Sequence, residues 1–419
     1  MHRLMTAAVA SVVLALGSSV AQGHMHGLYE IKPDGSGDFQ YLNEACTALE
    51  TIGMSGDCTF ELYDDSSLGQ AHLDSAPGNE SCAVVFRRAP GQTRVWMEGF
   101  AITGINRLAL ESLGFTSIRL AGCIGSRVSG CAFTGVYAGL DVISGASDTI
   151  VGNQMNAPYA GVSRGEFIYV SGASHVVIAN NFIQGPPGSS GWAGIYAYAS
   201  SGMKVYYNTV RLVPSSDWAC SVVRVENSGT LGHDFRNNLL ILGAGTEDPT
   251  SACIRVDETT GDTLASDHNC FYVADVGTVA CWNGVPLDFT DWQAMGFDPN
   301  GVNSDPMLVD SLDLHLQEGS PCIERGSPVL GFEVDVDGDP RDPVHPDIGA
   351  DEYKDVGVAE PTPAQSHAKG SMASIAGEVR FAGELFDAVG RRASTVRPGV
   401  YFAYPTTGVL LVRKVLVTR

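Results

Sequence analysis

Apolar and polar residues alternate in the same short pattern in six stretches between residues 118 and 256. Each stretch is a triplet with apolar outer residues and a mostly polar middle residue. The triplets are Ile118-Arg119-Leu120, Leu140-Asp141-Val142, Ile168-Tyr169-Val170, Ile195-Tyr196-Ala197, Val223-Arg224-Val225 and Ile254-Arg255-Val256. This alternation is typical of a strand with one buried face, and repetition every 20 to 50 residues or so is typical of a solenoid. We therefore predict stacked short strands with the middle residues facing outward.

A second apolar stretch and then an Asn follow most of the triplets. The second strands are predicted at Arg127-Val128, Thr149-Ile150-Val151, Val176-Val177-Ile178, Lys204-Val205 and Asp234-Phe235. The position after the second strand holds Cys131 in the first repeat and then Asn153, Asn181, Asn208, Asn238 and Asn269. Amides stacked about 4.8 Å apart can bond each other and the backbone at a bend. We interpret these Asn residues as a structural ladder rather than as catalytic groups.

Three segments resemble the right-handed parallel β-helix proteins of the pectate-lyase-like superfamily. They are the repeats 168–183 and 195–210, the entrance 29–39 followed by an amphipathic helix over 41–51, and a closing segment over 303–353 that ends in Asp347-Ile348-Gly349-Ala350-Asp351-Glu352-Tyr353. The helix places Leu42, Ala45 and Leu49 on one face, where they can cover the first rung. The resemblance spans about residues 28–353. It implies an all-β fold, a single-stranded right-handed parallel β-helix with an N-terminal capping helix, and the crossover rule gives the same hand.

The two ends of the chain predict export. Residues 1–21 have a basic start, a short apolar run and a small-residue cleavage site, as a Sec signal peptide does. A membrane anchor is the alternative, but the run is shorter than the roughly 20 residues of a spanning helix. Residues 22–353 form the solenoid and 354–376 have a linker composition. Residues 377–419 resemble the C-terminal sorting domain of type IX secretion cargo, with a small capping β-sandwich as the alternative.

The net charge of −22 is unevenly distributed. Residues 377–419 carry seven basic and three acidic side chains, so this tail is at +4 and the rest of the chain at −26. An acidic body repels nucleic acid and anionic membrane surfaces, so neither is expected as a partner. We expect a secreted or surface-attached monomer without a membrane span, whose partners are the type IX machinery and a glycan. A polyanionic glycan would need bridging cations.

Candidate chemistry lies on the outward face of the last four triplets. Residues two apart share this face, so the predicted site combines Arg224, Glu226, Arg255 and Asp257 as catalytic candidates with Tyr169, Tyr196 and Tyr198 as sugar-stacking candidates. Trp192 and Trp218 lie in loops before two of the strands and are further binding candidates. Glu226 and Asp257 would lie roughly 5 Å apart, a separation suited to retaining glycosidases or to a shared Ca²⁺. Alternatively, Arg224 with Asp257 and Arg255 with Glu226 are simple surface ion pairs.

Other catalytic or metal signals in the chain are weaker. Lys204 is the only Lys in the repeats, and no paired-Asp motif or repeated His position is present. The alternating acids of Asp335-Val336-Asp337-Gly338-Asp339 leave Ca²⁺ open as a cofactor, although the EF-hand Gly and Glu are missing. The ten Cys residues lack zinc-ligand spacing and, in an exported chain, predict disulfides. The pairings we expect are Cys46 with Cys58 or Cys82, Cys123 with Cys131, and Cys270 with Cys281.

Two functional hypotheses follow from these patterns. In the first, the chain is an exported or cell-surface β-helix protein that binds a polysaccharide on its outward strand face, with lyase or hydrolase cleavage left open. In the second, it is a non-catalytic adhesion or structural solenoid. The fold hosts both kinds of protein, so the fold does not decide between them.

Overall fold

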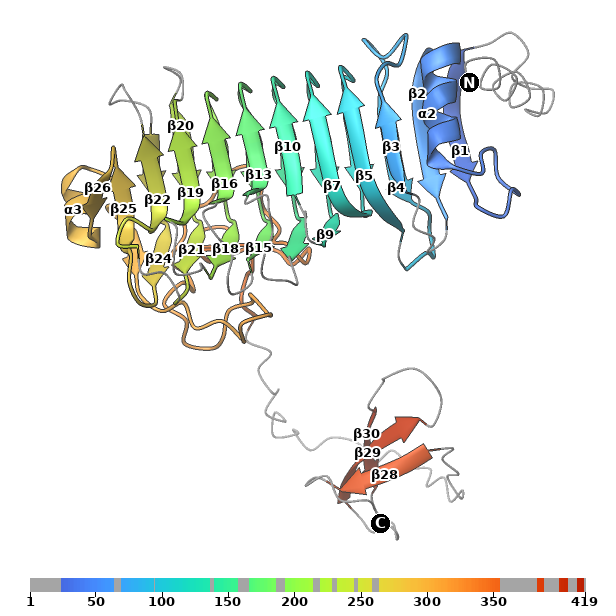
Figure 1. The fold of residues 1–419 in the computed structure, drawn as a ribbon. Helices are drawn as coiled ribbons and strands as arrows, with labels where there is room; N and C mark the ends of the chain where they lie inside the picture. The colour runs from blue at the N-terminus through green and yellow to red at the C-terminus, as the bar shows by residue number, and fades with distance from the viewer. Residues whose placement is uncertain are drawn as a thin grey trace. The chain divides into compact units, whose positions relative to one another are not determined.

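The chain forms a parallel β-solenoid, as its sequence predicts (Figure 1). The computed structural model describes residues 24–63, 69–93, 95–135, 139–156, 166–185, 193–213, 219–227, 232–244, 248–257 and 264–354, and the strands 383–387, 399–405 and 413–417. The predicted signal peptide lies outside the described residues, and so do Trp192 and Trp218. No described helix is both long and apolar enough to cross a membrane.

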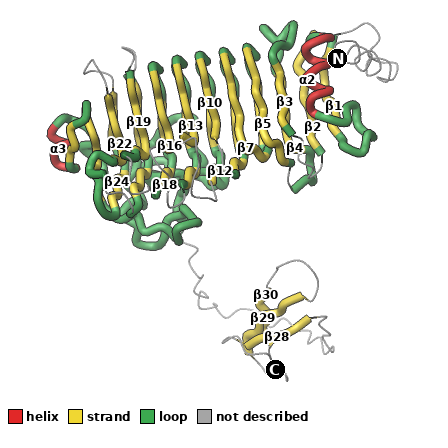
Figure 2. The backbone as a smooth tube through the Cα atoms, viewed as in Figure 1, coloured by secondary structure: helices red, strands yellow, loops and turns green. Residues whose placement is uncertain are grey.

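Three ladders of parallel strands form the walls of the coil (Figure 2). The ten-stranded sheet contains β1 (Met25–Ile31), β2 (Met54–Leu62), β4 (Val84–Arg88), β6 (Leu108–Glu111), β8 (Arg127–Ser129), β11 (Thr149–Val151), β14 (Val177–Ala179), β17 (Lys204–Tyr206), β20 (His233–Arg236) and β23 (Leu264–Asp267). The long-strand face contains β3 (Gln70–Leu73), β5 (Trp96–Thr103), β7 (Gly114–Ala121), β10 (Gly139–Ile143), β13 (Glu166–Ser171), β16 (Ala193–Tyr198), β19 (Ser221–Glu226), β22 (Ala252–Asp257) and β25 (Thr278–Trp282). The short-strand face contains β9 (Ala132–Thr134), β12 (Gln154–Asn156), β15 (Phe182–Gln184), β18 (Thr209–Leu212), β21 (Leu239–Leu242), β24 (Cys270–Val273) and β27 (Val302–Asn303).

Register along the long-strand face confirms the predicted inward and outward positions. Ile118, Leu140, Ile168, Ile195, Val223 and Ile254 pair in order and are at most 2% exposed. Their side chains stack in the interior, where each rung buries apolar surface that no single strand could bury alone. The middle residues of the triplets face outward, as the alternation requires.

The predicted Asn ladder is present and buried. The Nδ2 of each Asn donates to the Oδ1 of the next, over 2.9 Å from Asn153 to Asn181, 2.9 Å to Asn208, 3.0 Å to Asn238 and 2.9 Å to Asn269. The residue before each Asn has a left-handed φ, and this residue is Gly152 before Asn153. The sequence did not predict the end of the ladder. The buried Asp298 carboxylate accepts from the Asn269 Nδ2 at 2.8 Å and from the Trp292 Nε1 at 2.9 Å.

Both ends of the coil are covered. Helix α2 (Leu42–Ile52) lies over the first rungs and buries Leu42, Ala45 and Leu49, as predicted. At the far end, helix α3 (Phe289–Ala294) follows β26 (Val285–Leu287), which pairs antiparallel with β25. The Trp292 and Phe297 rings stack there at 4.2 Å, so aromatic side chains close this end of the interior.

The closing segment, residues 304–354, lies along the short-strand face (Figure 1). Cys322 and Ile348 pack against Leu239 of β21, and the Ala350 amide donates to the Thr209 hydroxyl of β18 at 2.9 Å. Phe332 of the segment also packs against Tyr206 of β17, so the segment covers the short-strand face and the adjoining part of the ten-stranded sheet. It leaves the long-strand face open. A separate unit, residues 356–419, contains an antiparallel sheet of β28 (Gly383–Asp387), β29 (Gly399–Pro405) and β30 (Arg413–Val417).

Candidate functional site

Two rows of outward residues run along the long-strand face. The first row is His72, Ala101, Arg119, Asp141, Tyr169, Tyr196, Arg224 and Arg255, one residue per strand from β3 to β22. The second row is Thr103, Ala121, Ile143, Ser171, Tyr198, Glu226 and Asp257. Neighbouring residues of a row are about 4.8 Å apart along the coil. The rows bring seven of the nine predicted site residues onto one surface.

The three predicted tyrosines form a cluster in the middle of this surface. The rings of Tyr169 and Tyr196 lie 5.3 Å apart, and those of Tyr196 and Tyr198 lie 6.2 Å apart. The Tyr196 hydroxyl donates to the Glu226 carboxylate at 2.6 Å, and the Arg224 guanidinium lies 5.1 Å from the Tyr196 ring. Burial, and then the bond to Glu226, raise the pKa of Tyr196 above its ordinary value. This phenol is therefore a neutral hydrogen-bond donor rather than a base.

Both predicted catalytic carboxylates are paired with arginines. The Arg224 Nη2 lies 2.8 Å from Glu226 and 3.7 Å from Asp257, and the Arg255 Nε lies 2.7 Å from Asp257. The expected pair of Arg224 with Asp257 is present, whereas Arg255 pairs with Asp257 of its own strand instead of with Glu226. Glycoside hydrolysis uses one carboxyl group as a proton donor to the leaving oxygen. In this group each carboxylate instead contacts a guanidinium.

Lys204 lies away from these rows. It is on β17 of the ten-stranded sheet, where it pairs in register with Val177 and Asp234. The coil separates it from the tyrosine cluster, so it cannot serve as a base for a substrate bound on the long-strand face.

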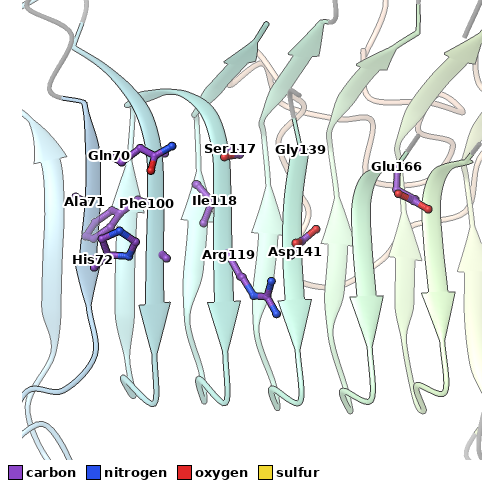
Figure 3. Close-up of a pocket in the computed structure, with 12 residues that line it drawn as sticks. Gln70, Ala71, His72, Phe100, Ser117, Ile118, Arg119, Gly139, Asp141 and Glu166 are labelled. Atoms are coloured by element: carbon purple, nitrogen blue, oxygen red, sulfur yellow. The ribbon is translucent and has the colours of Figure 1, made fainter. Parts of the chain in front are cut away.

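A hollow of about 200 Å³ lies on the same face, nearer the N-terminus. Its polar lining is Gln70, His72, Ser117, Arg119, Asp141 and Glu166, contributed by β3, β7, β10 and β13 (Figure 3). The small outward residues of β5, Gly99 and Ala101, leave space between His72 and Arg119. Figure 3 shows the Arg119 side chain extending toward β10, which carries Asp141. Asp141 in turn neighbours Tyr169 in the first row, so the hollow and the tyrosine cluster adjoin along this row.

Sequence reasoning missed this hollow, although a signal was present. Phe100-Ala101-Ile102 has the triplet pattern 18 residues before Ile118, and Ala71-His72-Leu73 has it 29 residues earlier still. Ala101 is a small apolar residue at the middle position, and the interval from Phe100 to Ile118 is shorter than the intervals between the six triplets. These two triplets therefore do not stand out from the sequence. Extending the register by two strands would have placed His72 and Arg119 on one surface.

The Asp335–Asp339 turn does not form the Ca²⁺ loop that its alternating acids suggest. The Asp335 side chain accepts from the backbone amides of Asp337, Asp339 and Glu352 over 2.7 to 3.0 Å, and it is buried. Asp339 pairs with Lys354, whereas Asp337 lies 2.8 Å from the His315 Nε2. The three carboxylates therefore have separate roles and do not converge on one another.

The predicted disulfides are not formed, because all ten cysteines are free and buried. Most stack as small apolar residues in the coil. Cys123 and Cys131 lie at different corners, where their thiols donate to the carbonyls of Ile102 and Leu110 at 3.8 and 3.5 Å. Cys270 meets Cys322 of the closing segment rather than Cys281, since strands β24 and β25 are on different walls.

The register defines the class of the chain as a parallel β-solenoid. No family model matches the chain, and no curated protein matches it. Among solved structures, the crystal structure of pectate lyase Pel9A is similar, with 11% sequence identity and a TM-score of 0.36 over 80% of this chain and 98% of that chain.

Proposed function

We propose that the long-strand face binds a polysaccharide along its first outward row. The hollow and the tyrosine cluster that adjoins it in the first row are the observation that carries this proposal. Aromatic rings offer flat apolar surfaces to sugar rings, and Arg119, His72 and Asp141 offer hydrogen bonds to hydroxyl groups. A row with one residue per rung suits a chain molecule laid along the coil.

The proposed function is binding without cleavage. Glu226 and Asp257 are the carboxylates predicted as catalytic on this face, and both are ion-paired with Arg224 or Arg255. The arginines orient the tyrosine cluster and contact the glycan. Secretion or surface attachment, implied by residues 1–21 and 377–419, belongs to the same proposal because it places the face among extracellular glycans.

Tyr169→Ala and Arg119→Ala test the binding face. The purified chain is screened against neutral and acidic polysaccharides with and without Ca²⁺, and the affinity of each hit is measured by calorimetry. We expect each substitution to weaken binding about tenfold, which corresponds to roughly 1.4 kcal/mol for a lost stacking or charged contact. Acidic glycans should need Ca²⁺, because the body of the protein is at −26.

Tyr272→Ala on β24 and Arg127→Ala on β8 are the matched controls, since both residues lie on other walls of the coil. They should leave the affinity unchanged. Equal affinity of Tyr169→Ala and wild type, or a panel without any hit, would refute the binding face. Release of new reducing ends or unsaturated products by the wild type, lost in Glu226→Gln, would refute the absence of cleavage.

A further inference from the structure

Three separate parts of the closing segment bring metal-ligating side chains together. His315 lies in a short hairpin, Asp337 comes from the Asp335–Asp339 turn, and Asp351 lies near the end of the segment. Their ligand atoms all lie within 4.8 Å of one another. Within the described ranges this is the one such group of His, Cys, Asp and Glu.

Both nitrogens of the His315 ring face carboxylates. The Nδ1 bonds the Asp313 carboxylate, and the Nε2 lies 2.8 Å from the Asp337 Oδ2. The edge of the Phe182 ring packs against the imidazole at 5.0 Å and fixes its plane. This is the arrangement of a metal-bound His, in which one nitrogen is the ligand and the other donates to an orienting carboxylate.

Asp351 supplies an oxygen from the buried side of the group. Its side chain is only 7% exposed, and its Oδ2 accepts from the Leu316 amide at 2.8 Å. The other carboxylate oxygen accepts no hydrogen bond from any residue that the structure describes, and it keeps some solvent-accessible surface. It is therefore available as a ligand to a cation.

We propose that His315, Asp337 and Asp351 bind a divalent transition-metal ion of the Zn²⁺ class, with Asp313 orienting the imidazole. The imidazole nitrogen favours this class over Ca²⁺, which takes oxygen ligands. Three carboxylates surround one imidazole, so a divalent ion balances their charge better than a single proton does. Asp337 is exposed, so the side of the site next to it is open to water ligands.

An ion bound there would join three parts of the closing segment, which lies against the short-strand face. The site is on another wall from the tyrosine cluster, so it does not depend on the glycan proposal. It predicts added stability, because an ion that binds only the folded chain stabilises it by mass action.

The test uses the untagged full-length chain after treatment with a chelator. Titration with ZnCl₂ by calorimetry should show one ion per chain and raise the thermal unfolding midpoint, and Co²⁺ should give a visible absorption spectrum at the same stoichiometry. His315→Ala and Asp337→Asn should each weaken Zn²⁺ binding at least tenfold and abolish the Co²⁺ spectrum. Asp337 is exposed, so its substitution leaves folding unaffected.

His345→Ala and Asp339→Asn are the matched controls in the same segment. His345 is exposed, and Asp339 belongs to the same turn as Asp337 but pairs with Lys354. Both variants should bind Zn²⁺ as the wild type does. A wild type that binds neither Zn²⁺ nor Co²⁺ would overturn the proposal, and so would equal binding by Asp337→Asn, which would mean that the ion sits on other residues.

Discussion

Single side chains at one corner of the coil bond the backbone of the preceding rung. The Asp148 Oδ1 accepts from the Ser126 amide at 2.8 Å, and three rungs further along the same column the His233 Nδ1 accepts from the Met203 amide at 3.3 Å. Both side chains are 1% exposed. Burial lowers the pKa of His233 to about 4. The structural role of this His therefore requires a neutral ring.

His233 makes stability depend on pH in a defined window. The folded pKa of about 4 lies below the ordinary value of 6.5, so the unfolded chain binds the proton first as the pH falls. Stability should therefore decrease between pH 6.5 and 4, by about 3 kcal/mol at most at 1.4 kcal/mol per pKa unit. The Asn side chain can accept from Met203 without titrating, so His233→Asn should remove this part of the slope in urea unfolding measured from pH 7 to 4.

The comparison for His233→Asn is His345→Asn, which changes an exposed His. Its pH slope should match that of the wild type. If His233→Asn retains the full slope, the acid sensitivity of the protein has another source.

At the scale of the element, the strands are too short to be stable alone, and the Asn ladder couples each rung to the next. Asn208 accepts from the Asn181 amide and Nδ2 and donates to Asn238. Asn208→Ala leaves these buried groups without partners, at about 1 to 3 kcal/mol each. We expect a loss of about 3 to 5 kcal/mol, measured by urea unfolding.

Asn303→Ala is the control for the ladder, because Asn303 lies on β27 with an exposed side chain. Its effect should stay below about 0.5 kcal/mol. If Asn208→Ala lowers the free energy of unfolding by an equally small amount, the ladder does not stabilise the coil.

The ladder and the rows could be predicted because both depend on local, repeated patterns. Alternation with a period of two tells which side of a strand faces the core, and the Asn recurs at one offset in each repeat. The hollow at Arg119 was missed, because it depends on the small size of Gly99 and Ala101 on a strand where the triplet pattern is weak.

At the scale of the whole molecule, contacts between distant segments escaped prediction. The closing segment was expected, but no local pattern tells which wall of the coil it covers. His315, Asp337 and Asp351 are separated by 22 and 14 residues, and they meet only because the segment folds against the short-strand face. The predicted cysteine pairings were wrong for the same reason, since cysteines that are close in the sequence lie on different walls of the coil.

The same packing predicts which cysteines can be oxidised. The thiols of Cys270 on β24 and Cys322 in the closing segment face each other, and both residues are 0% exposed. A disulfide reagent such as oxidised glutathione therefore reaches them only when the closing segment opens locally. Exchange would then link them, release two equivalents of glutathione, and attach the closing segment covalently to the coil.

Peptide mapping of the oxidised protein by mass spectrometry should find the Cys270–Cys322 link and the other eight thiols unmodified. The link should raise the thermal unfolding midpoint, because it closes a loop of about 50 residues in the unfolded chain. Cys322→Ser should abolish both effects, whereas Cys123→Ser should leave them unchanged because Cys123 lies in another part of the coil. A different link, or ten reactive thiols after oxidation, would show that the closing segment does not hold Cys322 against β24.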